Sequence, residues 1–210
     1  MFTVVEGVDG CGKSTQADML AKHLGAHYMK FPDSSSRTGK IIYQHLEKKW
    51  HARPLDASLE NDGSAMNALV FQCLQFANRL ERAEEIQRTR VLPGGVVSDR
   101  YLASAITYGA ADGIPMEYLI STQKTLPQPD LNILIDIPIE ESVKRRPERR
   151  DRYEEDSSFL ESVMANYNYL WSRMMKEEPG DWAIINGNRP KEEVHRDIVE
   201  AVMARRDIQP

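Results

Sequence analysis

The stretch that decides the fold is G-V-D-G-C-G-K-S at residues 7–14, which matches the pattern G-x-x-x-x-G-K-[ST]. Residues 2–5 before it are β-branched and aromatic and predict a strand. Residues from about 13 to 24 are rich in Ala, Leu and Lys and predict a helix. The glycines let backbone N–H groups turn inward around a phosphate, and the helix N-terminus adds partial positive charge. The alternative, an ordinary glycine-rich turn, is disfavoured by this strand–loop–helix context, so the sequence predicts a phosphate-binding P-loop.

The side chains of this loop have distinct expected tasks. Lys13 balances the charge of the β- and γ-phosphates, and Ser14 places a hydroxyl on Mg²⁺. Cys11 contributes its backbone, with a redox role as a minor alternative. The residues of the loop that we expect to bind ATP are Gly7, Gly10, Cys11, Gly12, Lys13, Ser14 and Thr15.

The motif indicates a phosphate ligand and leaves the reaction open. A GTPase switch needs a guanine-reading N/T-K-x-D string, and the nearest string, T-Q-K-T at residues 122–125, lacks the carboxylate. Motor and helicase ATPases are usually larger, and their nucleic-acid face is usually basic. A small phosphotransferase is the economical interpretation.

Short apolar strands alternate with helices along the rest of the chain. Strands are expected at residues 2–5, 27–31, 96–98, 131–137 and 182–185. Helices are expected at about 13–24, 38–49, 64–90, 101–111, 115–125, 140–146, 158–176 and 190–205, with a surface loop at 53–64. One apolar face of the longest helix is expected to hold Leu69, Cys73, Phe76 and Leu80. The alternation predicts an α/β, three-layer P-loop NTPase fold, with a five-stranded parallel sheet and helices on both faces.

Composition narrows the class of protein further. The 210 residues fit one domain, residues 1–210, and their 41% hydrophobic content suits a packed core. The 27 Lys and Arg against 32 Asp and Glu give a net charge of −5, which disfavours non-specific binding of nucleic acid. Two cysteines cannot build a disulfide framework or a four-ligand zinc site. No apolar run reaches membrane-spanning length, and a strand follows Met1 at once, so we expect a soluble, cytoplasmic protein with no membrane partner.

A second polar site follows the predicted strand at 96–98. Ligands collect at the carboxyl ends of parallel strands, which places Asp99 and Arg100 beside the P-loop. Asp99 can hold Mg²⁺ through water or accept a proton. Arg100 can clamp an anionic acceptor with its planar fork. The alternative is an ion pair at the strand end.

Several motifs in register resemble those of thymidylate kinases. They are GVDGCGKST (7–15), FPDSSSRTGK (31–40), FANRLE (76–81), DRYLASAITY (99–108), LPQPDLNILID (126–136) and DRYE (151–154). The resemblance runs from Phe2 to about Ile198. It implies a homodimeric, Mg²⁺-dependent P-loop enzyme that transfers the γ-phosphoryl group of ATP to dTMP. It also implies that residues 186–189, with Asn188, lie along the adenine.

The resemblance also implies roles on the acceptor side. Asp9 corresponds to the carboxylate on the 3′-hydroxyl, Arg100 to the arginine on the acceptor phosphate, and Asp99 to the carboxylate on the metal side. Tyr108 corresponds to the ring under the sugar, and Arg79 to the arginine that reads the pyrimidine carbonyl. The residues implied to bind the acceptor are Asp9, Pro32, Phe71, Gln75, Arg79, Arg100, Ser104, Tyr108 and Tyr153.

A charged segment at about 144–156 resembles the lid of these kinases. Its arginines are Arg145, Arg146, Arg149, Arg150 and Arg152. Gly10 stands where some family members place a basic residue in the P-loop, so a lid-supplied arginine, as in the common bacterial type, is implied. We expect Arg145, Arg149 and Arg152 to be catalytic with Lys13, Asp99 and Arg100. The alternative is a solvated charged helix.

Two positions depart from the family pattern. Ser34 stands where an arginine is usual, and Gln75 replaces the phenylalanine that usually stacks on thymine. Phe71, one turn earlier, could offer a displaced stacking surface. Gln75 would suit a pyrimidine with a polar 5-substituent, such as 5-hydroxymethyl-dUMP, or a water-filled pocket around dTMP. An ATP-dependent switch without acceptor chemistry and a deoxynucleoside kinase are the remaining alternatives.

Overall fold

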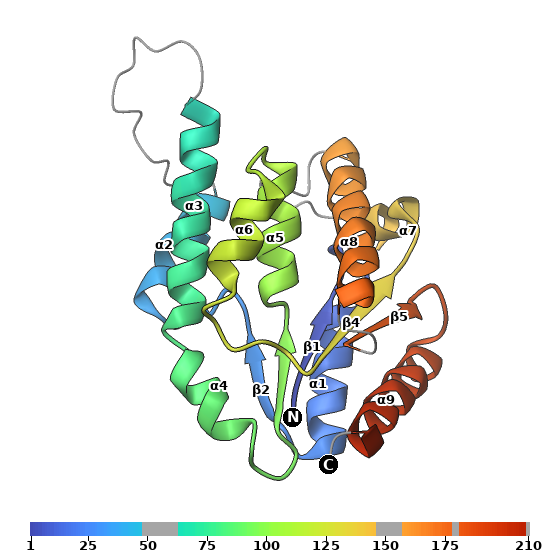
Figure 1. Cartoon of the computed structure of the whole chain (residues 1–210). Helices are drawn as coiled ribbons and strands as arrows, with labels where there is room; N and C mark the ends of the chain where they lie inside the picture. Colours follow the sequence, from blue (N-terminus) through green and yellow to red (C-terminus); the bar gives the residue numbers. More distant parts are fainter. Residues whose placement is uncertain (48–62, 146–156, 178–180, 209–210) are drawn as a thin grey trace.

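A computed structural model of the chain describes residues 1–47, 63–145, 157–177 and 181–208. Five parallel strands form one sheet in the order β2-β3-β1-β4-β5 (Figure 1). The strands are β1 (Phe2–Glu6), β2 (His27–Lys30), β3 (Val96–Asp99), β4 (Leu131–Asp136) and β5 (Trp182–Asn186). The predicted strands are therefore confirmed to within one residue at each end.

The register brings polar strand ends together. β1 pairs with β3 so that Val5 lies opposite Asp99, and β2 pairs with β3 so that Lys30 lies opposite Asp99. Because parallel strands end at the same edge of a sheet, Glu6, Lys30 and Asp99 gather there. The P-loop leaves the sheet at this edge.

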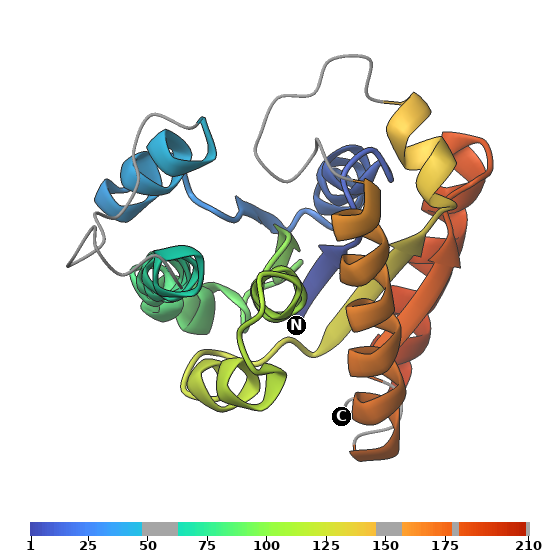
Figure 2. The ribbon, with the colours of Figure 1, turned by 90° about the horizontal axis from the view of Figure 1, so that it is seen from above.

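Helices cover both faces of the sheet (Figure 2). They are α1 (Lys13–Leu24), α2 (Arg37–Leu46), α3 (Gly63–Leu80), α4 (Ala83–Thr89), α5 (Leu102–Ala111), α6 (Met116–Gln123), α7 (Ile139–Lys144), α8 (Ser157–Glu177) and α9 (Lys191–Ile208). α1 and α9 pack together on one face, whereas α5 and α8 pack together on the other. The three-layer α/β prediction is confirmed.

The core lies on both sides of the central strands. Val5, Ile133 and Ile135 of the sheet are fully buried, as are Leu20 of α1 and Tyr167 of α8. Fully burying an aliphatic side chain of this size stabilises the fold by about 1.5–3 kcal/mol. The rigid core thus fixes the strand ends from which the polar side chains project.

The predicted helix at 64–90 is wrong, because it is two helices. α3 ends at Leu80, and α4 begins at Ala83. At the break, the backbone of Arg82 has φ −105° and ψ −2°, and its guanidinium is bound to Asp33 and Glu85. These side-chain bonds tie the break to the loop after β2.

The predicted apolar face of α3 is partly wrong. Leu69 and Phe76 pack against the core, but Cys73 is exposed and Leu80 is 53% exposed. The buried face carries Ala68 and Phe71 together with four polar residues: Gln72, Gln75, Asn78 and Arg79. The periodicity of apolar residues cannot predict this polar part of the buried face.

Candidate active site

The P-loop requires glycine at its first position. Gly7 has φ +141°, and a Cβ there would lie 2.7 Å from the Ile135 carbonyl oxygen and 2.8 Å from Cys11 Sγ. Gly12 has φ +93° and directly precedes α1. Cys11 is buried, and burial raises the pKa of its thiol, which keeps the sulfur protonated and unreactive.

Asp9 is the centre of the ionic network. Its Oδ1 accepts hydrogen bonds from Lys13 Nζ at 2.8 Å and from Arg100 Nη2 at 2.5 Å. Its Oδ2 accepts one from the Tyr108 hydroxyl at 3.1 Å. Burial alone would raise the pKa of Asp9, but the charges of Arg100 and Lys13 hold it well below its usual range. Asp9 therefore stays ionised and joins the P-loop to the segment after β3.

Arg100 is held in an uncommon conformation. Among the described residues it is the only non-glycine with positive φ, at +67°. Its backbone N–H donates to the Val5 carbonyl at 2.9 Å, and its Nη1 donates to Ser104 Oγ at 3.0 Å. Burial alone would lower the pKa of Arg100, but Asp9 raises it well above its ordinary value. Such backbone strain clusters at functional sites, and here it aims a permanent cation at the P-loop.

Glu6 organises the support of Arg100. This buried carboxylate accepts hydrogen bonds from the Tyr101 N–H at 2.9 Å and from the Ser104 N–H at 3.3 Å. Its other oxygen accepts from Ser104 Oγ at 2.5 Å and from the Tyr167 hydroxyl at 3.0 Å. The end of β1 therefore fixes the start of α5, including the hydroxyl that Arg100 contacts.

Asp99 lies between the P-loop and β2. Its Oδ2 accepts a hydrogen bond from Ser14 Oγ at 2.5 Å and lies 3.4 Å from Lys30 Nζ. Its Oδ1 is buried and has no hydrogen-bond partner among the described residues. A carboxylate and a hydroxyl side by side are oxygen ligands of the type that Mg²⁺ takes. These two residues therefore fit a magnesium ion that is otherwise held by water and phosphate.

The buried face of α3 forms another polar cluster. Arg79 is 2% exposed; its Nη1 donates to the backbone and side-chain oxygens of Gln75 at 2.8 and 2.9 Å. Its Nε and Nη2 donate to the Tyr101 carbonyl at 3.0 and 2.7 Å. Burial lowers the pKa of Arg79 to about 10, so the side chain still carries its charge at neutral pH. Its guanidinium lies 5.6 Å from the centre of the Phe31 ring.

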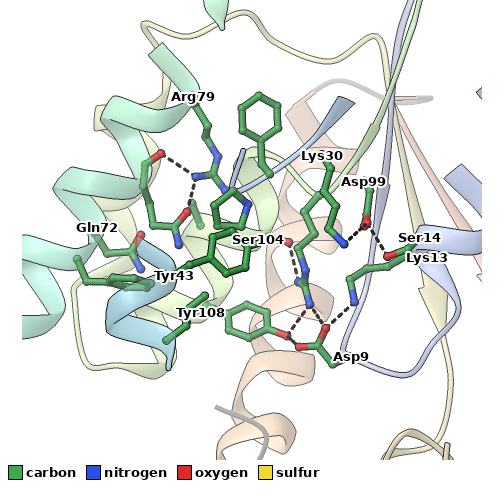
Figure 3. Close-up of a pocket in the computed structure, with 17 residues that line it drawn as sticks. Asp9, Lys13, Ser14, Lys30, Tyr43, Gln72, Arg79, Asp99, Ser104 and Tyr108 are labelled. Atoms are coloured by element: carbon green, nitrogen blue, oxygen red, sulfur yellow. Dashed lines mark hydrogen bonds and ion pairs between the residues drawn. The ribbon is translucent and has the colours of Figure 1, made fainter. Parts of the chain in front are cut away.

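One cavity of about 400 Å³ connects these groups (Figure 3). Gln72 and Arg79 lie at what we call the α3 end, and Lys13, Ser14 and Asp99 at the loop end. The predicted site residues that line the cavity are Asp9, Lys13, Ser14, Pro32, Phe71, Gln75, Arg79, Asp99, Arg100, Ser104 and Tyr108. Sequence positions up to 99 apart thus meet in one site.

Arg145 and Phe71 make contacts that the sequence did not predict. Arg145 does not line the cavity; it donates to the Gly187 carbonyl and to Asn188 Oδ1, both at 3.2 Å. Phe71 lines the cavity but stacks on His45, with ring centres 4.5 Å apart. Arg149, Arg152 and Tyr153, with most of the predicted lid at 144–156, lie outside the described residues. Most of the predicted loop at 53–64 also lies outside them.

Sequence reasoning missed four polar residues of the site: Glu6, Lys30, Tyr43 and Gln72. Lys30 ends β2 and could have been found by the rule that placed Asp99. Glu6 directly precedes the P-loop, and a charge inside an apolar strand signals a buried partner. No sequence signal distinguishes Tyr43 or Gln72 from ordinary helical residues.

No helix in the described part of the chain is long and apolar enough to cross a membrane. The same residues contain no group of three His, Cys, Asp or Glu side chains placed to hold a metal ion. A magnesium site here would therefore depend on the phosphates of a bound nucleotide for most of its charge.

Comparisons with known proteins find relatives over nearly the whole chain. The sequence model of the thymidylate kinase family matches residues 5–198. A probable thymidylate kinase of Methanococcus aeolicus is 30% identical over 99% of this chain and 98% of its own. One from Pyrococcus horikoshii is 33% identical over 96% of this chain and 95% of its own. A thymidylate kinase structure from Candida albicans superposes with a TM-score of 0.81 at 26% identity, covering 97% of this chain and 91% of that one.

The match spans the P-loop, the Asp99–Arg100 pair and α3 together. The chain belongs to the thymidylate kinase family, the nucleoside monophosphate kinases that transfer the γ-phosphoryl group of ATP to dTMP.

Proposed function

We propose that the cavity holds dTMP with its base at the α3 end and its phosphate at Arg100, facing ATP on the P-loop. One observation carries this proposal: Asp9 of the P-loop, Arg100 after β3 and Tyr108 of α5 are joined by hydrogen bonds. The ATP side and the acceptor side of the site are therefore already held in place relative to each other before either nucleotide binds. Phosphoryl transfer is accelerated mainly by such positioning and by charge stabilisation.

On the ATP side, the backbone of the P-loop wraps the phosphates, and Lys13 neutralises them. Lys13 Nζ donates hydrogen bonds to Asp9 Oδ1 at 2.8 Å and to the Val8 carbonyl at 3.2 Å. To contact the phosphates of ATP, the lysine must therefore leave these two partners. Ser14 and Asp99 are the residues that would hold Mg²⁺, which when bound neutralises charge on the transferring phosphates. Asn188 lies along the adenine.

On the acceptor side, Arg100 grips the phosphate, and Asp9 receives the 3′-hydroxyl. Tyr108 lies beneath the sugar: its ring centre is 5.0 Å from the Arg100 guanidinium. Lys30 adds a cation to the cavity, with its Nζ 3.4 Å from Asp99 Oδ2. The chain has this basic group in the cavity and a serine, in place of the family's usual arginine, at position 34.

The lid supplies the remaining arginines, Arg145, Arg149 and Arg152, and Tyr153 contacts the acceptor. Gly10 in the P-loop leaves no basic side chain at that position, which supports a lid-supplied arginine. Alanine substitution of Arg149 or Arg152 is expected to lower kcat by about 10²- to 10³-fold with little change in KM for dTMP, because the charge acts in the transition state.

We also infer that the protein is a homodimer in which each chain is one kinase domain. We propose that it acts in the cytoplasm and binds no nucleic acid. Cys73 and Leu80 present exposed apolar surface on α3, which supports an interface there. Sedimentation should give twice the chain mass, and Leu80→Glu should shift it toward the monomer. A monomeric wild type at enzymatic concentrations would refute the dimer.

A coupled assay across dTMP, dUMP, 5-hydroxymethyl-dUMP, dCMP and dGMP tests the acceptor. The highest kcat/KM is expected for dTMP. Gln75 favours 5-hydroxymethyl-dUMP as the second candidate, because a carboxamide offers hydrogen bonds where the family usually offers a ring. The related Candida albicans kinase has broad substrate specificity, so a wide panel of acceptors is warranted.

Two controls separate the other classes of function. Thymidine without its phosphate should give no turnover, which would exclude a deoxynucleoside kinase. ADP release that does not depend on any acceptor would instead indicate an ATP-driven switch. Lys13→Ala and Arg100→Ala should each lower kcat/KM by at least about 10²-fold while the circular dichroism stays unchanged.

A further inference from the structure

The strongest unexplained feature of the cavity is the side chain of Gln72. It is 5% exposed, and its Oε1 is buried without a hydrogen-bond partner among the described residues. Buried polar atoms of native proteins nearly always find a partner. The Gln72 side chain lines the cavity, and turning its carboxamide would bring this unpaired acceptor onto a ligand that supplies the donor.

The neighbouring groups at the α3 end offer the opposite polarity. Gln75 Oε1 accepts from Arg79, so the carboxamide of Gln75 turns its two N–H donors elsewhere, and they meet no partner among the described residues. Arg79 uses one N–H of Nη2 on the Tyr101 carbonyl, which leaves the other N–H of Nη2 uncommitted. The wall thus presents donors next to one acceptor.

The fold makes room for Gln72 at this place. Gly109 of α5 faces it: a Cβ at position 109 would lie 2.9 Å from Gln72 Cδ and 3.1 Å from Nε2. Glycine inside a helix is less stable than alanine. A glycine at this contact preserves the space that the carboxamide occupies beside the cavity.

A donor beside an acceptor is complementary to a ring carbonyl beside a ring N–H. Thymine presents O4 next to N3–H, whereas cytosine presents an amino group next to an unprotonated nitrogen. On the basis that the chain phosphorylates dTMP, we propose that Gln72 accepts the hydrogen bond of thymine N3–H while Arg79 and Gln75 donate to O4. Gln72 is thereby a specificity-determining residue of this kinase.

This pairing explains how a pocket without the usual stacking ring selects its base. Gln75 cannot supply the apolar contact of a phenylalanine, so discrimination has to come from hydrogen bonds along the base edge. A site built to bond a substrate N–H rejects an analogue that lacks it, because the acceptor of the site is then left unpaired.

The test compares dTMP with N3-methyl-dTMP, in which the donor is replaced by a methyl group. Wild type is expected to prefer dTMP by at least about 100-fold in kcat/KM. Gln72→Ala removes the acceptor and opens space, so that this preference should fall about tenfold or more. The change should appear mainly in KM, because the base lies far from the transferred phosphoryl group.

The matched control is Gln123→Ala. Gln123 also has a buried, unpaired Oε1 within the described part of the chain, but it lies on α6 outside this cavity. It should keep the wild-type preference even if stability falls.

Gln72→Met is the second variant, for use if the alanine variant does not fold. It keeps the side-chain volume and removes the hydrogen-bonding groups. In this variant kcat/KM for dTMP should fall about tenfold, whereas kcat/KM for dCMP should not fall.

The outcomes separate this inference from the proposed function. If wild type forms dTDP but Gln72→Ala retains the full preference for dTMP over N3-methyl-dTMP, Gln72 does not read the base and the inference is wrong. An equal fall for dTMP and dCMP in Gln72→Met has the same meaning. If wild type forms no dTDP at all, the proposed function itself fails.

Discussion

At the scale of single residues, the site balances opposite charges at close range. Asp9 lies between two cations, Lys13 and Arg100, and each pair is closer than 3 Å. Removing one member leaves its partners with an incompletely balanced charge, which costs stability. The ionic centre therefore contributes to stability as well as to phosphate binding.

The first prediction concerns the acid stability that Asp9 provides. The folded-state pKa of Asp9 is lowered, so its contribution is complete above its unfolded pKa of about 3.9 and is lost as pH falls below that value. Urea unfolding should show Asp9→Asn less stable than wild type from pH 5 to 7. The difference should shrink below about pH 4.

Asp18→Asn is the control for this measurement. Asp18 forms an exposed i,i+4 pair with Lys22 on α1, and exposed pairs contribute about 0–1 kcal/mol. Its substitution should leave stability nearly unchanged across the pH range. A pH-independent loss in Asp9→Asn would contradict the assigned cause.

The second prediction concerns the guanidinium fork of Arg100. Arg100→Lys keeps the charge but cannot contact Asp9, Ser104 and a phosphate together. We expect kcat/KM for dTMP to fall by about 10²-fold, while the KM for ATP changes less than threefold. Wild-type activity in this variant would show that only charge is needed.

At the scale of elements, periodicity gives the architecture and fails where polar residues are buried. The strands and most helices follow from apolar runs and breaks, and the P-loop follows from its motif. The two-helix arrangement of α3 and α4 could not be predicted, because the break depends on Arg82 binding Asp33, 49 positions away in sequence. The buried polar face of α3 was hidden for the same reason: its partners come from other elements, as the Tyr101 carbonyl does for Arg79.

Part of the site was accessible to motif reasoning and part was not. The rule that ligands gather at strand ends placed Asp99 and Arg100 beside the P-loop, and the hydrogen bonds of Ser14 and Asp9 agree. Gln72 has no motif, because its importance comes from a missing partner, which only three-dimensional contacts reveal.

The third prediction concerns the start of α2, which supplies Tyr43 to the cavity. Ser36 is the N-cap of α2, and its Oγ accepts from the Gly39 N–H at 3.0 Å and from Asn78 Nδ2 at 2.9 Å. Ser36→Ala should lower the free energy of unfolding by about 1–2 kcal/mol. Ser34→Ala, at an exposed position, should change it by less than about 0.5 kcal/mol. Equal effects in the two variants, measured by urea unfolding, would show that the cap does not matter.

At the scale of the whole molecule, the parallel sheet brings residues that are far apart in the sequence into one site. The P-loop, the end of β3 and the face of α3 meet only because β1 lies between β3 and β4 and α5 joins α3 to the sheet edge. The residues proposed to bind ATP and the base of dTMP lie at opposite ends of one cavity (Figure 3), so each nucleotide should stabilise the native state independently.

The fourth prediction follows from this arrangement. Each nucleotide at about 100 times its Kd should raise the thermal midpoint by about 5–10 °C. Lys13→Ala should lose the shift with ATP and keep the shift with dTMP, whereas Arg100→Ala should do the reverse. Loss of both shifts in both variants would mean that the two ends are not separate sites.

The most direct test of the whole account follows the label of [γ-³²P]ATP in the presence of dTMP. Wild type should form labelled dTDP at one equivalent per ADP, and Lys13→Ala and Arg100→Ala should each lose at least about 10²-fold in kcat/KM. Release of labelled inorganic phosphate at an equal rate with and without dTMP would contradict this account.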